Sequence, residues 1–224
     1  MPRIARAVAP GFPHHVVQRG NNRGDIFFSD EDRAVYLFLL KTYSEKWGSA
    51  ILSYCLMPNH VHLLVRPSSE SSLQKTMQGV TLCYTQHINR KYRRTGRLWE
   101  SRYHSCIIDQ EAYLWAVARY VEQNPVRAAI VRNPQDYRYS SAPAQFGLVL
   151  DPVLSEDLFP EIQREEYVDF IQQPVISQAE MKKIRRSVRT GRPLGDARFV
   201  EEIEQRLGKR LTPLAHGRPR KKHP

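Results

Sequence analysis

The alternation of apolar and polar residues along the first half of the chain predicts strands and helices in turn. Four short segments are rich in aliphatic or aromatic residues and are bounded by turn-forming residues, which is typical of β-strands. Pro58 and Asn59 form a turn between the second and third of these segments, which predicts a β-hairpin. The predicted strands are residues 14–19, 50–57, 60–66 and 103–108.

Three longer segments carry apolar residues at helical spacing. Ser29 and Asp32 have the spacing of a capping box, with Asp in place of the usual Glu or Gln, and Gly48 should end the helix that they begin. Asp109 opens the third helix, which Pro125 should terminate or kink. The apolar stripes are Tyr36, Leu39, Leu40, Tyr43 and Trp47 in the first helix, Leu73, Met77, Val80, Tyr84 and Ile88 in the second, over about residues 72–92, and Leu114, Val117, Ala118 and Val121 in the third.

The order of these elements, βαββαβα, predicts an α+β fold in which helices pack on one mostly antiparallel sheet. After Tyr139 the pattern loosens and contains several prolines, which indicates a boundary. We therefore expect a first domain at residues 1–145 and a small, helical and basic C-terminal appendage at residues 146–224, with about ten disordered residues at its end. Short amphipathic helices are expected near residues 161–172, 177–190 and 197–207.

Length and composition are those of one globular domain with an appendage. The 224 residues are 41% hydrophobic and 25% charged, which argues against a disordered chain or a coiled coil. No apolar run approaches the ~20 residues that cross a membrane, and the N-terminus lacks the apolar core of a secretory signal, so we expect a cytoplasmic protein without a membrane partner. Cys55, Cys83 and Cys106 are widely spaced and odd in number, which predicts reduced thiols in the core.

Positive charge is concentrated at the C-terminal end. The chain carries 34 Lys and Arg against 23 Asp and Glu, a net charge of +11. Residues 175–224 hold 14 of the basic and 5 of the acidic residues, so most of the excess lies there. A nearly balanced body with a basic appendage suits a protein held on a polyanion, because each neutralised phosphate releases counterions. The alternative is a tail that only solubilises the protein or adheres to ribosomes.

His60 and His62 are the first candidate functional residues. They stand two positions apart on a predicted strand, so their imidazoles should project from the same face, while Val61 faces the other way. Two neighbouring imidazoles are half of a metal site. The alternative is a polar pair on the exposed face of the hairpin, and the spacing alone does not decide between the two.

Tyr120 and Asn124 are the second candidate pair. They lie one turn apart on the third predicted helix, so they should share a face, and this face differs from the apolar face that should pack on the sheet. A phenol and a carboxamide could therefore point to the same place. The alternatives are an amphipathic aromatic at the rim of the core for Tyr120 and a helix-ending residue before Pro125 for Asn124.

Three motifs together resemble the REP-associated tyrosine transposases, a branch of the HUH single-tyrosine transposases that process single-stranded DNA. The resemblance runs in order from about residue 14 to residue 141. Its motifs are MPNHVHLLV at residues 57–65, RLWESRYHS at residues 97–105 and RYVEQNPVRA at residues 119–128.

This resemblance implies a ferredoxin-like HUH sandwich and specific roles for the candidate residues. His60 and His62 would hold a divalent metal, Mg²⁺ or Mn²⁺, and Tyr120 would be the nucleophile. Asn124 takes the place of the third ligand, which is commonly Gln in the wider superfamily. The implied substrate is single-stranded and hairpin DNA formed by repetitive extragenic palindromes (REP).

The chemistry of these residue types agrees with such a reaction. A phosphodiester resists attack because its charge repels nucleophiles, so an enzyme needs a cation on its oxygens and an aligned nucleophile. A tyrosine hydroxyl can form a phosphotyrosine, from which a phenolate departs readily, so cleavage is reversible. Two imidazoles and one amide oxygen form a sparse neutral ligand set, which suits Mg²⁺ or Mn²⁺ completed by water and phosphate.

Basic residues around two motifs suggest the DNA-binding surface. Charged side chains interleaved with aromatic rings are what single-strand binding uses, with stacking worth ~1–3 kcal/mol per base, whereas the alternative is a solvated helix end and a core tryptophan. A short Gly-Arg-Pro-Arg motif near the C-terminus resembles a minor-groove hook. The candidate DNA-binding residues are Arg19, Asn21, Arg23, Lys91, Arg93, Arg94, Arg97, Trp99, Arg102, Arg218 and Arg220, with Tyr103 beside Trp99. The remaining histidines, His14, His15, His87 and His104, are expected at the surface or the rim of the core.

The leading hypothesis is a metal-dependent endonuclease and strand transferase that acts on single-stranded DNA as a monomer or homodimer, without a small-molecule cofactor. Two alternatives remain open. In the first, the metal activates water, and no covalent adduct forms. In the second, the protein only binds nucleic acid through its basic end, so His60→Ala and chelation would change nothing and deletion of residues 175–224 would abolish all activity.

Overall fold

The structure is a computed structural model that describes residues 6–155, 158–173 and 177–212. The predicted elements of the first half are all present, and short helices follow them. The chain forms β1 (His14–Arg19), η1 (Asn21–Arg23), α1 (Asp30–Trp47), β2 (Ser49–Met57), β3 (His60–Pro67), α2 (Ser72–Lys91), β4 (His104–Ile107) and α3 (Gln110–Glu122). It continues with α4 (Asn124–Arg127), η2 (Pro134–Asp136), α5 (Ala142–Gln145), η3 (Glu161–Gln163), α6 (Arg164–Gln172), α7 (Gln178–Thr190) and α8 (Ala197–Leu207).

The four strands form one antiparallel sheet in the order β2-β3-β1-β4. Because β3 lies between β1 and β2, the chain makes a split βαβ crossover through α1, which is the ferredoxin-like arrangement. Across the β1–β3 pair, Arg19 lies opposite His60 and Val17 lies opposite His62. The predicted α+β fold is confirmed, and the strand with the two histidines is central in the sheet.

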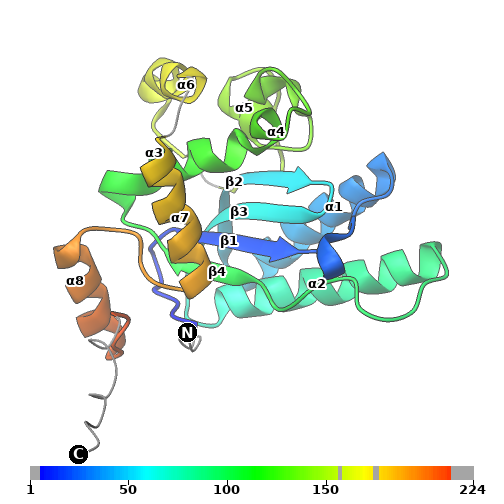
Figure 1. The fold of residues 1–224 in the computed structure, drawn as a ribbon, viewed down its shortest axis with the longest axis horizontal. Coiled ribbons are helices and arrows are strands. Elements are labelled where there is room, and N and C mark those ends of the chain that lie inside the picture. The colour runs from blue at the N-terminus through cyan, green and yellow to red at the C-terminus, as the bar shows by residue number, and fades with distance from the viewer. Residues whose placement is uncertain (1–5, 156–157, 174–176, 213–224) are drawn as a thin grey trace, which may run out of the picture.

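Helices cover both faces of the sheet (Figure 1). On one face α1 and α2 pack against each other and on side chains such as Val61 and Leu63 of β3. On the other face α3 packs on the sheet, where Leu64 and Val117 belong to one buried cluster. Because side chains alternate along a strand, His62 lies on the α3 face together with Leu64. The candidate metal ligands thus face the helix that carries Tyr120.

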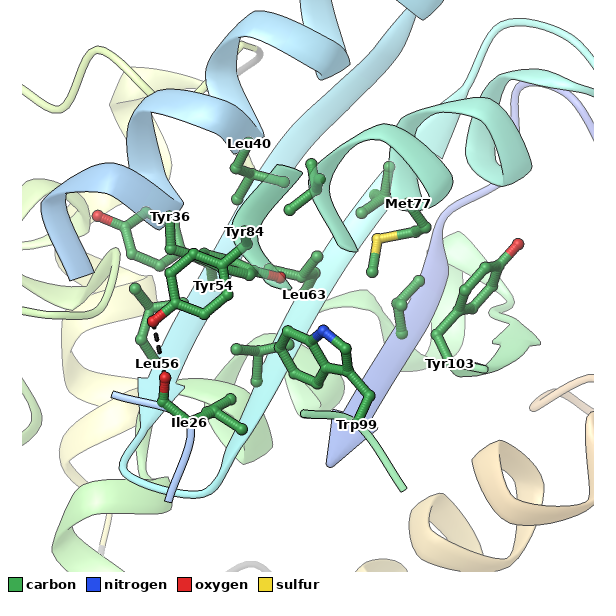
Figure 2. Packing of buried hydrophobic residues seen from close by; sticks show 14 of the residues in the cluster. Ile26, Tyr36, Leu40, Tyr54, Leu56, Leu63, Met77, Tyr84, Trp99 and Tyr103 are labelled. Carbon is green, nitrogen blue, oxygen red and sulfur yellow. Dashed lines mark hydrogen bonds between the residues drawn. The ribbon is translucent and has the colours of Figure 1, made fainter. Parts of the chain in front are cut away.

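The core between the sheet and helices α1 and α2 is rich in large aromatic side chains (Figure 2). Tyr36 and Tyr84 are fully buried, and their perpendicular rings lie with centroids 5.1 Å apart. The hydroxyl of Tyr84 donates a hydrogen bond to the carbonyl oxygen of Ile26 at 2.7 Å. Trp99 belongs to the same cluster. This core therefore combines apolar burial with a satisfied hydroxyl on Tyr84, whereas the buried hydroxyl of Tyr36 has no partner among the described residues.

The ends of α1 follow the predicted signals. The Ser29 hydroxyl accepts a hydrogen bond from the Asp32 amide at 3.3 Å, and the Asp32 carboxylate accepts one from the Ser29 amide at 3.0 Å. This is the predicted capping box, with the shorter Asp in the position of Glu. The helix ends at Gly48, whose φ of +63° is the left-handed conformation that glycine adopts without strain.

Among the helices of the C-terminal region, α6 packs on α3 and α7 packs on the β4 edge of the sheet. α7 contacts β4 and β1 and lies beside α3 (Figure 1). Its Ile184 joins Leu194 and Leu114 in the cluster under α3. The amide of Leu194 also donates to the carbonyl oxygen of Ile107 at 2.8 Å, which ties the chain after α7 to β4. The three short helices predicted in this region are therefore present, and α7 comes directly against the strands.

Two of the three cysteines lie in the core as predicted, and Cys83 does not. Cys55 and Cys106 are buried, Cys83 is partly exposed, and all three are free thiols. Among the described residues, no helix combines the length and the apolar character needed to cross a membrane.

His14 connects the N-terminal segment to β1 and is fully buried, where the sequence suggested a surface position. Its Nε2 accepts a hydrogen bond from the Ala9 amide at 3.2 Å, and its Nδ1 donates to the carbonyl oxygen of Phe12 at 2.8 Å. Burial lowers the pKa of His14 to about 4, an effect that the Phe12 carbonyl partly opposes. The ring is therefore neutral in the folded protein at pH 7.

The free energy of unfolding should consequently depend on the protonation of His14. Between pH 4 and pH 6.5 the unfolded chain binds a proton on His14 that the folded protein excludes. The free energy of unfolding therefore has its full value with respect to His14 above about pH 6.5 and decreases as the pH falls toward 4. For His14→Gln we expect lower stability than wild type at pH 7.5, and a difference that shrinks by about 2 kcal/mol at pH 4.5. Urea unfolding at both pH values measures this, and a constant difference would contradict it.

Candidate active site

The two histidines of the predicted pair lie side by side at the start of β3. The ring centroids of His60 and His62 are 4.9 Å apart. His60 donates its Nδ1 hydrogen to Oδ1 of Asn59 at 2.6 Å, and Nδ1 of His62 lies 3.0 Å from Nε2 of His15 on β1. The remaining nitrogen of each ring, Nε2, has no hydrogen-bond partner among the described residues. Both rings line a pocket, so these two nitrogens are available to a ligand.

Both imidazoles are neutral at physiological pH. Burial lowers the pKa of His60 to about 4, and the positive charge of Arg19 on the neighbouring strand contributes. Burial also holds the pKa of His62 well below its usual value, and the neighbouring histidines add to the effect. A neutral imidazole has a lone pair for a metal, so no proton has to be displaced when an ion binds.

Tyr120, at the end of α3, packs directly on this group of histidines. Its ring is edge-on to those of His15 and His62, with centroids 5.7 Å away in both cases, and its hydroxyl accepts a hydrogen bond from Nε of Arg185 at 3.4 Å. The prediction that Tyr120 faces away from the sheet is wrong: the side chain is 5% exposed and belongs to the buried cluster under α3. The reason is that the end of α3 meets the sheet where it presents imidazoles, on which a phenol packs well.

Asn124 lies at the start of α4 and closes the end of α3. Its Nδ2 donates to the carbonyl oxygens of Tyr120 and Val121, both at 3.0 Å, and its Oδ1 accepts from Nη2 of Arg127 at 2.8 Å. The helix-ending role that the sequence left open is therefore realised. Oδ1 keeps a second lone pair, so a role as ligand remains chemically possible.

The donor atoms present fit a divalent cation with a partly open coordination sphere. His60, His62 and Asn124 all line the pocket, and a set of two neutral imidazoles and one amide oxygen leaves several positions for water and phosphate. Within the described ranges, no three His, Cys, Asp or Glu side chains are arranged to hold a metal. A closed structural site of the zinc type is thus not formed by these residues.

The pocket around Tyr120 is large and strongly cationic. Its volume is about 970 Å³, and its walls come from β1, β2, β3, β4, α3, α4 and α7. Glu100 is the acidic residue among those that line it. The cationic lining residues are Arg19, Arg127, Lys182, Arg185, Arg186 and Arg189. Such a pocket attracts a phosphate backbone.

Four of these cations lie on α7, which the sequence analysis missed as part of the site. Lys182, Arg185, Arg186 and Arg189 stand at positions i, i+3, i+4 and i+7, so they share one helix face. This spacing was visible in the sequence. Nothing in the sequence indicated that the face would meet the end of α3, since that depends on how the C-terminal region packs.

His15 was also missed, because it was expected at the surface. It is fully buried, it stacks on His62 with ring centroids 5.3 Å apart, and burial lowers its pKa to about 3. His104, likewise set aside, lines the pocket at the start of β4. The position of His15 on β1, which pairs with β3, is the signal that could have placed it next to His62.

The base-stacking role suggested for Trp99 and Tyr103 does not fit the structure. Trp99 is 7% exposed, packs in the core under α2, and donates its indole hydrogen to Oγ1 of Thr85 at 3.0 Å. Tyr103 is 6% exposed, and the guanidinium of Arg6 covers its ring at 4.0 Å. Neither ring presents a face to a base, so the alternative of a core tryptophan is correct.

The predicted basic residues fall into two groups. Lys91 is engaged within the protein, where it binds Asp32 at 2.8 Å and Glu31 at 2.6 Å, and Arg94 lies over the ring of Phe28 at 5.2 Å. Lys91 corrects the prediction, because its charge already has two carboxylate partners, whereas Arg94 is exposed and contacts only a ring. The remaining described candidates, Arg19, Asn21, Arg23, Arg93, Arg97 and Arg102, are exposed, and of these Arg19 lines the pocket. Arg218 and Arg220 lie outside the described residues.

Comparisons with known proteins relate the chain to a family and to a solved fold. The sequence profile of the IS200-like transposases matches residues 11–124. A solved REP-associated tyrosine transposase bound to a REP hairpin has a similar fold, with a TM-score of 0.57 and 14% sequence identity over 79% of this chain and 100% of the other. A transposase from Deinococcus radiodurans R1 has 15% identity and a TM-score of 0.38 over 55% of this chain and 97% of its own. Comparison with curated proteins gave no match.

The fold and the matching profile define the class of protein: a single-tyrosine transposase, an enzyme that acts on DNA. The chain belongs to the IS200-like transposase family, since the profile covers half of its length. The resemblance to tyrosine transposases seen in the three sequence motifs is confirmed at this level.

Proposed function

We propose that this chain cuts and rejoins single-stranded DNA next to a palindromic hairpin, through a covalent 5′-phosphotyrosine on Tyr120. The observation that carries the proposal is the position of Tyr120. Its ring lies 5.7 Å from that of His62, on the wall of a pocket with six cationic side chains. The fold likeness to a transposase bound to a REP hairpin supports hairpins of this kind as the substrate.

The bond changes follow from a tyrosine nucleophile. The hydroxyl oxygen of Tyr120 attacks phosphorus, a bond between this oxygen and phosphorus forms, and the bond from phosphorus to the 3′ oxygen breaks. The phenol loses one proton and the departing 3′ oxygen gains one, so charge balances. The reverse reaction with another 3′ hydroxyl rejoins the strand, and because the phosphotyrosine keeps the energy of the broken bond, no outside source of energy is needed.

The metal site is proposed at His60 and His62, with Asn124 as a third ligand. Mg²⁺ or Mn²⁺ bound there would neutralise charge on the phosphate oxygens as a Lewis acid. His62 can present Nε2 to an ion when its Nδ1 hydrogen is donated to His15, 3.0 Å away. Asn59 fixes the tautomer of His60 in the same way, at 2.6 Å. The chain's own contribution is to hold both imidazoles neutral and oriented.

We further propose a division of work along the chain. Residues 1–145 form the catalytic domain, with the tyrosine and the histidines, and residues 146–224 hold DNA against it through α7. The cationic surface extends from the pocket to the exposed side chains of Arg19, Arg23 and the arginines before β4, with the polar Asn21 beside them. We also propose that the protein is cytoplasmic, where it can reach DNA. The proposed reaction needs no small-molecule cofactor.

The test is direct detection of the covalent intermediate. Incubation with a labelled palindromic hairpin that carries a single-stranded 5′ extension, with and without Mn²⁺, should give a protein–DNA adduct on a denaturing gel. Peptide mapping should place the adduct on Tyr120. Cleavage without any adduct would instead indicate a nuclease that uses activated water, and binding without cleavage would indicate a protein that only binds DNA.

A further inference from the structure

The cationic face of α7 forms one wall of the active-site pocket. Lys182, Arg185, Arg186 and Arg189 line it, and Figure 1 shows α7 beside α3 and across the β4 edge of the sheet. In the described part of the chain, none of these four side chains forms an ion pair with a carboxylate. By contrast, Arg119 on α3 does pair with a carboxylate, that of Glu180 on α7, at 3.6 Å. As far as the described residues go, no carboxylate pairs with this face of α7, so its charges are available to phosphates.

One of the four touches the reacting atom. Nε of Arg185 donates a hydrogen bond to the hydroxyl oxygen of Tyr120 at 3.4 Å. A planar guanidinium has five donor hydrogens in a fixed fork, so Arg185 can hold this oxygen with one of them and direct others to a neighbouring phosphate oxygen.

A second guanidinium, that of Arg127, contacts the same tyrosine. Arg127 covers the Tyr120 ring at 4.5 Å and donates from Nη2 to the Tyr120 carbonyl oxygen at 2.7 Å and to Asn124 at 2.8 Å. Its Nη1 is buried and has no partner among the described residues. Burial lowers the pKa of Arg127, and the nearby positive charge of Arg185 lowers it further. Two cations are thus held close together around Tyr120, which an anion between them would stabilise.

We propose that Arg185 is a catalytic residue of this transposase, which binds the phosphate under attack and stabilises the negative charge that develops on the Tyr120 oxygen. The proposal rests on the function proposed above and adds a residue outside the matched profile, which ends at residue 124. Arg127 is a positioning residue, since it holds the Tyr120 backbone and Asn124. The C-terminal region then supplies part of the chemistry as well as affinity for DNA.

The experiment compares Arg185→Gln with wild type in the full-length protein. Single-turnover cleavage of the hairpin oligonucleotide at saturating protein with Mn²⁺ measures the chemical step, and fluorescence anisotropy measures affinity. Removal of one donor to a developing oxyanion costs ~10²–10³-fold in rate, so we expect a loss of this size with a much smaller change in affinity. Arg185→Lys keeps the charge without the planar fork, so its cleavage rate should lie between those of wild type and Arg185→Gln.

Lys183→Gln is the matched control, because it removes the same charge from the same helix. Lys183 contacts the Tyr113 hydroxyl and does not line the pocket, so the cleavage rate of the Lys183→Gln variant should equal that of wild type. If Arg185→Gln and Lys183→Gln lose the same factor in cleavage rate, the cause is the loss of positive charge on α7 in general, and the proposal is overturned. Unchanged or faster cleavage by Arg185→Gln would also overturn it, and faster cleavage would identify α7 as a cover over the pocket.

These outcomes are separable from failure of the proposed function. If wild type forms no adduct on Tyr120, the phosphotyrosine mechanism itself is wrong. If wild type forms the adduct and Arg185→Gln forms it at the same rate, only the role of Arg185 is wrong. Retained DNA affinity and an unchanged thermal unfolding midpoint show that each variant is folded.

Discussion

Replacement of Tyr120 by phenylalanine is expected to lower hairpin cleavage by roughly 10⁴-fold or more, to background, because loss of the nucleophile in a covalent mechanism removes the reaction path. DNA affinity should stay close to that of wild type, since the ring still packs on His15 and His62 and the cationic walls of the pocket are unchanged. Gel assays of cleavage and of the adduct, together with anisotropy, measure both quantities.

Tyr113→Phe is the control for this variant. Tyr113 lies on the same helix, is partly exposed, and receives a hydrogen bond from Lys183 outside the pocket, so its loss should leave cleavage unchanged. Continued cleavage by Tyr120→Phe in the presence of metal would show that water or another tyrosine attacks the phosphate. The converse result, in which both variants lose cleavage, would point to damage of α3.

Removal of the metal or of His60 is expected to have the second large effect. Metal ions contribute several kcal/mol of transition-state stabilisation, so His60→Ala should slow cleavage by roughly 10³-fold. His60 is the better choice for substitution, because His62 is buried between His15 and Tyr120 and its loss would leave a cavity there. Excess chelator should stop wild-type cleavage, and added Mn²⁺ should restore it.

A separate measurement of metal binding makes this prediction independent of activity. Titration calorimetry with Mn²⁺ should show clearly weaker binding by His60→Ala than by wild type. His87→Ala serves as the control, since His87 lies on α2, on the opposite side of the sheet from the pocket. Cleavage that survives both chelation and His60→Ala would exclude the proposed metal site.

Local patterns in the sequence were sufficient for the secondary structure. The capping box at Ser29 and Asp32, the stop at Gly48 and the apolar stripe of α2 from Leu73 to Ile88 all occur as predicted, because each depends on residues within a few turns. The pair His60 and His62 shares one strand face for the same reason. Distances between residues of one element follow from its period alone.

Partners that belong to different elements were not predictable in this way. Lys91 looked like a DNA contact, but α1 brings Asp32 and Glu31 to it. Trp99 looked like a stacking platform, yet it is enclosed by the core under α2. Whether a charge or a ring is free depends on what lies opposite it, and this is decided by long-range packing.

By itself, the sequence determined the order of strands and helices in the first half and the two histidines on one strand face. It also predicted Tyr120 and Asn124 on one helix, whereas α3 ends at Glu122 and Asn124 begins α4. The tertiary structure decided which of these features meet. It placed Tyr120 on His15 and His62, buried Trp99, and brought Arg185 of α7 to the tyrosine hydroxyl. The physical reason is that periodicity specifies a side chain's direction within its own element, whereas the active site is assembled from elements far apart in the chain, whose contacts depend on the packing of the whole core.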